Sequence, residues 1–599
     1  MAMATIAATA GCGSSGGGSS GDDPNLANCS PSDCVVIDVA VSSEKSDLMG
    51  QLGKDFNSTN PTVGDKRVAV RTKTKASGEA ADQLANGWPS GNPNDPQPVL
   101  WSPAASAWGT VLDQRLAAAG KKPMATKGTP LMNSPLTIAM PKPMADALGY
   151  PQKAIGWSDI LALTKDPQGW AAYGHPEWGP FRLGKTNPNF STSGLHAFVA
   201  QNYAATDKTT GLTAEDLASP TVAAFNEAVE SSVVHYGDTT LTFLNNWYRA
   251  DQRGNPYTYA SAVAVEEKSV VDYNTGNPDG VLDAGEVPRK PRVPLVAVYP
   301  KEGTLFSDSP FFVLDASWVS ADQRTAAQQF VDFLQQPDNQ QKVLQYGFRP
   351  GNPSVPVSAP LSAENGVDVA QPKTTMQVPS GPVLVDLLQR WDQQRKGARV
   401  LLVLDVSGSM GEEVDDGQTK LDLAKRAASD SLVQFKPSDL VGLREFSTQL
   451  GPESKDSFID LAPVAPVAAQ EERLHTEIDR LVPTNGTPLY EVVQQSMQAM
   501  IDGYDPARIN AVVLLTDGKN EDGNSSDDTK QLNTLVRFLQ DKTLGENATP
   551  VRLFTIGYGS GADAGVLKQI AEAANGKYYA ATSDPTTINK VFTQVISNF

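Results

Sequence analysis

One stretch constrains the fold of this chain more than any other: the apolar run 400–404 ends in Asp405, and Ser407 and Ser409 follow at alternate positions. A continuous Val/Leu run of this kind, closed by Asp and Gly, is typical of a strand buried in a parallel sheet. The loop after such a strand lies at the carboxyl edge of the sheet, where open α/β sheets bind ligands. Because alternate residues point to one side, the three side chains offer a hard cation three oxygen donors with one formal charge among them.

Two later stretches add oxygen side chains to the same edge. Thr487 lies in Asn-Gly-Thr-Pro between two helical patterns, and a second buried strand, 511–515, leads to Asp517. Right-handed crossovers bring both to the edge that carries Asp405. The alternative is an ordinary cluster of helix caps and turns. Caps and turns, however, would not explain why three separate loops all carry oxygen side chains at the same edge, whereas a metal site requires this.

The order and spacing of these residues resemble the metal-ion-dependent adhesion site of von Willebrand factor A (VWA) domains, over about residues 396–599. The resemblance implies a metal shell that an Asp or Glu carboxylate of a protein partner completes. Mg²⁺ is favoured because hydroxyl ligands and retained waters suit a small octahedral ion, with Mn²⁺ and Ca²⁺ as alternatives. In this family pattern Ser407, Ser409 and Thr487 ligate the metal directly, while Asp405 and Asp517 hold waters around it.

Helical and strand patterns alternate through the rest of the C-terminal region. Apolar residues recur at helical spacing over 421–435, and strand-like runs follow at 439–446 and 551–556. Strands separated by helices predict a doubly wound, mainly parallel sheet. The predicted fold class is therefore α/β, with the Rossmann-like arrangement that the VWA resemblance implies.

The N-terminal half repeats one local pattern three times: a strand, a hydroxyl-rich turn and the start of a helix. The free N–H groups at a helix start favour an anion or another polar ligand. No catalytic constellation follows any of these turns, which suits a cleft that binds a small molecule. The candidate ligand-binding residues in the turns are Ser42, Ser43, Ser102, Thr186, Asn187 and Ser193.

The order of segments in this half predicts two lobes. Two extended apolar segments, 134–140 and 293–299, fit a pair of hinge crossings. The layout, with Trp101-Ser-Pro-Ala, Thr186-Asn-Pro and Tyr299-Pro-Lys-Glu-Gly, resembles bacterial extracellular solute-binding proteins. The resemblance implies a periplasmic-binding-protein-like domain whose lobes close about a hinge on a small solute. The domain is predicted over 35–360, with one lobe made of 35–135 and 295–360 and the other of 136–294.

A stretch rich in Pro, Ser and Gly follows residue 353 and indicates the end of a domain. We expect a linker and a short amphipathic helix over 361–395, and then the VWA domain over 396–599. The apolar side of this helix, which includes Trp391, can pack against either neighbour. The two domains are therefore not expected to move freely.

Composition excludes several classes of function. The formal net charge is -19 and no basic block stands out, which argues against a nucleic-acid partner. The four histidines are scattered, and none forms a Ser/His/Asp arrangement, so we expect no enzymatic activity.

An oxygen-rich stretch, 272–286, favours a solvated hairpin loop over a calcium loop, because the first two positions of an EF-hand do not match.

All three cysteines lie in the first 34 residues. Cys12 stands between small residues and a Gly/Ser-rich run, which resembles the end of a truncated bacterial lipoprotein signal followed by a tether; a disordered tail is the alternative. We expect lipidation at Cys12. Cys29 and Cys34 favour a small disulfide loop, since a metal pair would lack its other two ligands. No other run of about 18 apolar residues occurs, so a lipid would be the membrane anchor.

Two hypotheses about function follow. The first is a non-enzymatic cell-envelope protein, lipid-anchored outside the bacterial cell membrane, that grips a protein partner through the metal and binds a small solute in its cleft. The second is the solute-binding component of a transport system, in which the VWA domain is a structural or regulatory attachment.

Overall fold

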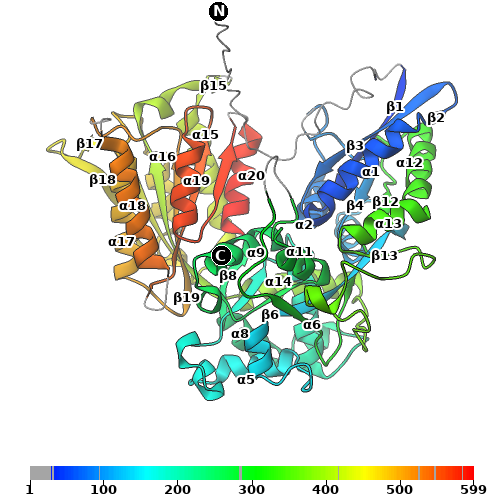
Figure 1. Ribbon diagram of the computed structural model, residues 1–599. Helices are drawn as coiled ribbons and strands as arrows, with labels where there is room; N and C mark the ends of the chain where they lie inside the picture. Colours follow the sequence, from blue (N-terminus) through cyan, green and yellow to red (C-terminus); the bar gives the residue numbers. More distant parts are fainter. Residues whose placement is uncertain are drawn as a thin grey trace, which may run out of the picture.

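The structure is a computed structural model that describes residues 29, 33–92, 95–281, 287–415, 417–523, 527–544, 548–582 and 585–599. The N-terminal half forms two lobes, called lobe 1 and lobe 2. The C-terminal domain stands beside lobe 1, with lobe 2 beneath both (Figure 1). A groove lined by residues of both, among them Lys73 and Lys590, lies between lobe 1 and the C-terminal domain. Each body is a sheet covered by helices. The predicted α/β fold class is confirmed.

Lobe 1 is built on a sheet in the order β2-β3-β1-β4-β12-β5. Its central strand, β1 (Cys34–Val41), lies parallel to β3 and β4 and is almost wholly buried, as expected for a strand inside an α/β layer. The other strands are β2 (Thr62–Val63), β3 (Lys66–Thr74), β4 (Leu100–Ser102), β5 (Gly128–Pro130) and β12 (Pro310–Val313). The helices are η1 (Ser43–Lys45), α1 (Ser46–Ser58), α2 (Ser77–Asn86), α3 (Ala107–Ala118), α12 (Ala321–Leu334) and α13 (Pro337–Gln345).

Lobe 2 is organised around the long strand β6 (Met132–Pro141), in a sheet of order β10-β6-β9-β7-β8. The start of β6 also pairs with β11 (Phe306–Ser307) and β13 (Arg349–Pro350), so the chain crosses between the lobes here. The sequence pattern assigns residue 295 onward to lobe 1, whereas β10 (Leu295–Val298) pairs with β6 in lobe 2. Lobe 1 resumes at β12.

The remaining elements of lobe 2 carry the turns that face lobe 1. Its other strands are β7 (Leu183–Thr186), β8 (Val233–Gly237) and β9 (Ala262–Glu266). Its helices are α4 (Lys142–Ala147), α5 (Trp157–Lys165), η2 (Gly169–Tyr173), η3 (Pro176–Trp178), α6 (Thr192–Thr206), α7 (Ala214–Leu217), α8 (Pro220–Ser231), α9 (Thr240–Gln252), α10 (Pro256–Tyr259) and α11 (Glu267–Thr275). The oxygen-rich stretch begins within α11, where Asp272 pairs with Lys268; residues 282–286 lie outside the described residues.

The segment predicted as a linker lies against the lobes. Within it, η4 is a short 3-10 helix (Ala363–Asn365), Thr375 bridges to Thr304, and the Gln377 amide donates to the Thr209 carbonyl at 2.9 Å. Helix α14 (Gly381–Gln394) then packs on α3 of lobe 1 and on α6 and α8 of lobe 2. The connection thus touches both lobes before it enters the C-terminal domain.

The C-terminal domain has a sheet in the order β18-β17-β14-β19-β20-β21, parallel except for the edge strand β18. Its strands are β14 (Gly397–Asp405), β17 (Leu440–Leu450), β18 (Asp456–Pro466), β19 (Arg508–Thr516), β20 (Val551–Tyr558) and β21 (Tyr578–Ala581), with a small ribbon of β15 (Glu413–Asp415) and β16 (Gln418–Thr419). Its helices are η5 (Gly408–Gly411), α15 (Lys420–Ser431), η6 (Leu432–Gln434), α16 (Val467–Asp479), α17 (Leu489–Asp502), α18 (Asp528–Thr543), α19 (Ala564–Ala573) and α20 (Pro585–Ile596).

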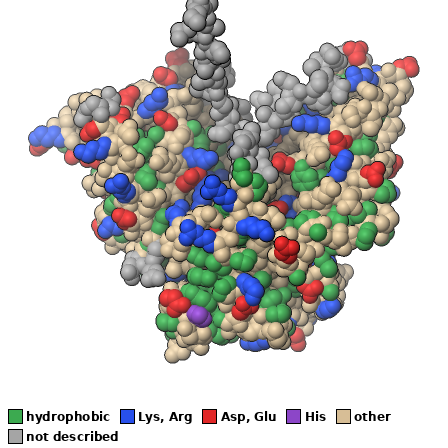
Figure 2. All heavy atoms as spheres, viewed as in Figure 1, with side chains coloured by type: hydrophobic (Ala, Val, Ile, Leu, Met, Phe, Trp, Pro, Cys, Tyr) green, Lys and Arg blue, Asp and Glu red, His purple; other side chains and the backbone are tan. Residues whose placement is uncertain are grey.

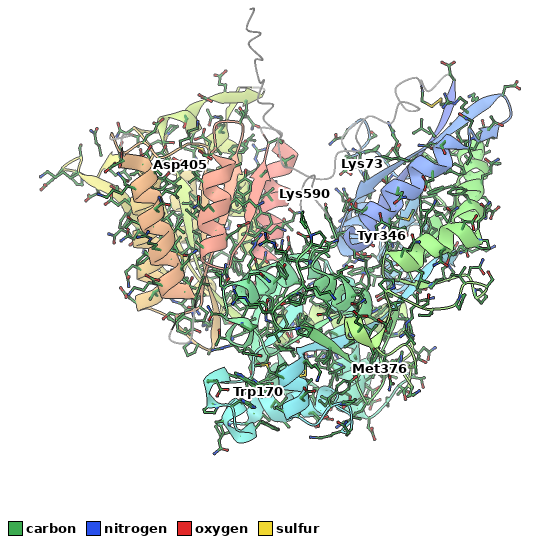
Figure 3. All side chains as sticks on the ribbon, in the orientation of Figure 1. Lys73, Trp170, Tyr346, Met376, Asp405 and Lys590 are labelled. Carbon is green, nitrogen blue, oxygen red and sulfur yellow. A yellow bond between two sulfur atoms is a disulfide. The ribbon has the colours of Figure 1, made fainter. Side chains whose placement is uncertain are left out.

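The C-terminal domain is docked on lobe 2 by polar contacts. Lys577 Nζ lies 2.7 Å from Asp238 Oδ2, and Asn187 Nδ2 donates to the Ser597 carbonyl at 3.1 Å. Lys590, which faces the groove toward lobe 1 (Figure 3), pairs with Glu79 at 2.9 Å. The C-terminal domain therefore contacts both lobes.

Near the N-terminus, a disulfide joins Cys29 to Cys34 at the start of β1. Cys12 lies outside the described residues. Among the helices that are described, none is both long and apolar enough to cross a membrane.

Candidate metal centre and solute cleft

The carboxyl edge of the C-terminal sheet holds Asp405 in a fixed position. Its carboxylate is fully buried: Oδ1 accepts the Ser407 amide at 2.7 Å, and Oδ2 accepts the hydroxyl of Thr516 from β19. Burial raises the pKa of Asp405 to about 7. With its oxygens already engaged by the protein, Asp405 is placed to organise the loop.

The predicted serines and Asp517 form a connected set of oxygens. Ser407 Oγ lies 3.2 Å from Ser409 Oγ, and Ser409 Oγ donates to Asp517 Oδ1 at 2.7 Å. Thr487 approaches from a third loop: a Cβ atom added at Gly518 would lie 2.9 Å from Thr487 Oγ1. The structure thus brings all five predicted positions to one edge of the sheet.

A lysine that sequence analysis did not single out joins this set. Lys420, the first residue of α15, places Nζ 2.7 Å from Asp517 Oδ2 and 2.6 Å from Glu412 Oε2. Burial alone would lower the pKa of Lys420, but its contacts with the two carboxylates raise it. Lys420 follows β16, and Asp517 follows β19, 97 residues later in the chain. No local spacing in the sequence therefore indicates that the two side chains meet.

The donor set fits a small hard cation. Hydroxyl and carboxylate oxygens lie within hydrogen-bonding distance of one another, and oxygens are the ligands that Mg²⁺ prefers. In the part of the chain that the structure describes, no three His, Cys, Asp or Glu side chains gather as a metal cluster. A site at this edge would therefore depend on hydroxyl ligands, as the adhesion-site pattern implies.

Between the lobes, a small cavity is lined by Ser42 and Ser43 of lobe 1 and Ser193 of lobe 2. The other three predicted ligand residues do not line this cavity. Ser102 is fully buried, and its hydroxyl has no hydrogen-bond partner among the described residues. Thr186 Oγ1 lies 2.9 Å from Ser193 Oγ, and Asn187 donates to the C-terminal domain. Half of the predicted set therefore faces the cleft.

The cleft is acidic, which the hydroxyl-rich turns did not reveal. Glu44, Asp238 and Glu266 line it, and no Lys or Arg does among the described lining residues. Burial and repulsion by Glu44 raise the pKa of Glu266 to about 7. Asp238 is paired with Lys577, so Glu44 and Glu266 are the carboxylates that oppose the binding of an anion, although helix starts by themselves favour one.

The two lobes touch each other directly across the cleft. The Gly78 amide donates to the Phe190 carbonyl at 3.0 Å, and Trp108 Nε1 donates to Thr192 Oγ1 at 2.8 Å. The cavity that remains is about 30 Å³, which is room for a few water molecules at most. The structure is thus a closed form of the two-lobed domain.

Comparison with known proteins supports two domains. A family model described as "Bacterial extracellular solute-binding protein" matches residues 37–349, and the model for "von Willebrand factor type A domain" matches residues 400–594. Two uncharacterized proteins from strains of Mycobacterium tuberculosis, MT1884 and Rv1836c, are each 22% identical over 568 residues, covering 92% of this chain and 76% of theirs.

Solved structures show similarity to each half. The periplasmic binding protein AfuA from Actinobacillus pleuropneumoniae is 14% identical, with a TM-score of 0.41 over 60% of this chain and 99% of that one. A von Willebrand factor type A protein from Catenulispora acidiphila is 19% identical, with a TM-score of 0.27 over 34% of this chain and 42% of that one. The solute-binding model alone matches more than half of the 599 residues. The chain therefore belongs to the bacterial extracellular solute-binding protein family and carries a VWA domain behind its two-lobed domain.

Proposed function

We propose that this protein is a non-enzymatic binding protein of the cell envelope that grips a protein partner through Mg²⁺ at its VWA domain and takes a small solute in its cleft. The observation that carries the proposal is the connected oxygen set of Ser407, Ser409 and Asp517 at the carboxyl edge of the sheet. In the proposed site, Thr487 and the two serines hold the metal, and Asp405 and Asp517 hold its waters.

The charge of the site supports a partner that supplies a carboxylate. Asp405 is buried and hydrogen-bonded, and Asp517 shares its charge with Lys420. A divalent cation held mainly by hydroxyls keeps most of its positive charge, so an Asp or Glu of the partner is the ligand that best completes the shell. Bound there, Mg²⁺ would supply the electrostatic attraction for that carboxylate.

The experiment that tests the metal site is isothermal titration of the full chain with Mg²⁺, Mn²⁺ and Ca²⁺. Ser409→Ala should weaken binding of the preferred metal at least about tenfold, which is about 1.4 kcal/mol. Ser457→Ala, which removes a surface hydroxyl bonded to Glu491, is the control. Equal affinity in wild type and Ser409→Ala would refute the site.

Partner binding is tested on the same variants. Capture of envelope proteins by the full chain should require divalent metal and should be lost with EDTA and with Ser409→Ala, while Ser457→Ala retains it. A partner that binds equally well under all these conditions would refute the metal bridge.

The second candidate function is a solute-binding component of a transport system. It is supported by the two-lobed domain and by the polar cavity between the lobes. The carboxylates favour a cationic or polyhydroxyl solute. In a thermal-shift screen of the full chain against amines, basic amino acids and sugars, a ligand at about 100 times its dissociation constant should add about 2.7 kcal/mol. This solute class would be wrong if an oxyanion stabilised the protein and substitutions in the cleft abolished that stabilisation.

Membership of an extracellular solute-binding family indicates an extracytoplasmic location. The proposed anchor is a lipid on Cys12. Cys12→Ser should move the protein from the membrane fraction to the soluble extracytoplasmic fraction. Unchanged membrane association would argue against lipidation.

A further inference from the structure

A second pocket, which we call the junction pocket, lies where lobe 2 meets the VWA domain. Its volume is about 450 Å³, within the range of about 300–1,000 Å³ that is usual for small-molecule sites. Figure 2 shows Lys and Arg side chains gathered on the surface where α9 meets the VWA domain. The cationic residues that line the pocket are Arg182 and Arg253 of lobe 2 and Lys396, Arg508 and Arg552 at the VWA domain.

The lining of the junction pocket carries an excess of positive charge. Its described lining residues include no Asp or Glu. Two carboxylates lie nearby: Asp505 pairs with Arg508 at 3.2 Å, and Glu572 pairs with Arg249 at 2.9 Å. Even with both included, the positive charges outnumber the negative ones.

Hydrogen bonds to backbone carbonyls position three of these cations but do not neutralise them. Arg182 Nη1 donates to the Thr258 carbonyl at 2.8 Å, and Lys396 Nζ donates to the Val233 carbonyl at 3.0 Å. Arg552 Nη1 donates to the Asn575 carbonyl at 2.8 Å. Neutral carbonyl oxygens fix the direction of each side chain and leave its charge in place.

Burial makes this arrangement unfavourable in the absence of a counter-charge. Arg552 is only 5% exposed, and its guanidinium lies 5.3 Å from the Tyr259 ring centre. Burial lowers the pKa of Lys396 to about 8, and the repulsion of Arg182 and Arg552 adds to that effect while Asp505 opposes it. Cations held close together with little water repel one another, and a bound anion would relieve that repulsion.

We infer that the junction pocket binds a phosphorylated small molecule, with its phosphate held between the cations of lobe 2 and those of the VWA domain. Guanidinium groups pair with two oxygens of a phosphate at once, and a lysine adds a point charge. Tyr259 and Tyr504 line the same pocket and offer aromatic surface to the rest of the ligand. This site is separate from the metal edge and from the acidic cleft, so the inference goes beyond the proposed function.

The test is isothermal titration of the full chain, in EDTA, with pyrophosphate and with glucose 6-phosphate. Lys396→Gln and Arg182→Gln, one on each side of the junction pocket, should each weaken binding at least about tenfold. Higher salt should weaken binding to wild type, because the attraction is electrostatic. Arg324→Gln, which removes a surface cation paired with Asp315, should leave the affinity unchanged.

Further variants and probes distinguish phosphate binding at the junction pocket from binding in the cleft between the lobes. Unphosphorylated glucose should not bind at the junction pocket, and Glu266→Gln in the cleft should not alter phosphate affinity. Circular dichroism verifies that each variant is folded. The inference is overturned if neither phosphate probe binds at about 1 mM, the weak end of small-molecule affinity. It is also overturned if the pocket variants bind like wild type, or if Glu266→Gln changes the phosphate affinity instead. Because this titration contains no divalent metal, its failure leaves the metal bridge unaffected.

Discussion

At the scale of single residues, the acids of the cleft are the least expected feature. Glu44 and Glu266 are far apart in sequence and line the same cavity from opposite lobes. Glu266 is 7% exposed, and Ser307 donates a hydrogen bond to its Oε1 at 3.2 Å. The pKa of about 7 for Glu266 means that this residue makes stability depend on pH.

The sign of that dependence follows from the raised pKa. Between the ordinary value of 4.5 and about 7, the folded protein keeps the proton of Glu266 while the unfolded chain has lost it. The stability that this residue contributes is full below about 4.5 and is lost as the pH rises through about 7. The shift corresponds to about 3 kcal/mol.

Glu266→Gln, which stays neutral, should therefore gain stability relative to wild type as the pH is raised from about 5 to about 8. Urea unfolding at a series of pH values measures this difference. His196, whose burial lowers its pKa to about 4, destabilises both proteins at acid pH and largely cancels in the comparison. A difference that stays constant over the range would show that Glu266 does not titrate as described.

Residues of the metal edge were predictable because their signal is local. Asp405, Ser407 and Ser409 lie within one loop, and the crossover rule brings Asp517 to the same edge. Lys420 was not predictable in this way: its contact with Asp517 joins positions 97 residues apart. The cleft turns were found by their hydroxyls, but the direction of a side chain such as Asn187 depends on the neighbouring domain.

At the scale of secondary-structure elements, α14 connects the parts of the molecule. Its buried residues face α3 of one lobe and α6 and α8 of the other. Trp391 is 1% exposed and meets Tyr236 of β8 edge to face, with ring centres 5.0 Å apart. An element with these contacts restrains the hinge as well as the connection to the VWA domain.

Trp391→Ala should lower the free energy of unfolding by about 3–5 kcal/mol, because it removes a large buried side chain. Gln393→Ala, an exposed change on the same helix, should stay within about 0.5 kcal/mol of wild type. Chemical unfolding of both variants makes the comparison. If Trp391→Ala were as mild as its control, α14 would not be the packed connection described.

The periodicity of α14 predicted an amphipathic helix, and its choice of partners was left open. That choice depends on surfaces contributed by three distant helices, which no local pattern contains. The same reason explains β10: an apolar strand does not reveal which of two sheets it joins, and its pairing with β6 decides the matter.

At the scale of the whole molecule, the VWA domain is fixed to lobe 2 by charged contacts. Asp238 is 8% exposed, and it receives Lys577 Nζ at 2.7 Å and the Tyr579 hydroxyl at 3.3 Å. Lys577 and Asp238 lie 339 residues apart in the sequence. The α/β class and the order of domains were accessible from sequence, but this docking was not.

Lys577→Glu places a second negative charge against Asp238 and should weaken the docking by about 2–5 kcal/mol. Small-angle X-ray scattering should then show a larger radius of gyration than wild type. Lys455→Glu, at an exposed position beside Glu453, should leave the radius unchanged. Equal radii for Lys577→Glu and wild type would show that the charged contact does not hold the domain in place.

Strand β14 runs from the junction pocket to the metal edge. Lys396 lines the pocket just before the strand, and Asp405 is its last residue. A strand of nine residues spans about 30 Å, so the two ends are well separated. A protein partner at one end and a phosphorylated ligand at the other would not compete for space. If both proposals hold, a ternary complex can form, and any influence of one ligand on the other would change both measured affinities by the same factor and in the same direction, as a closed thermodynamic cycle requires.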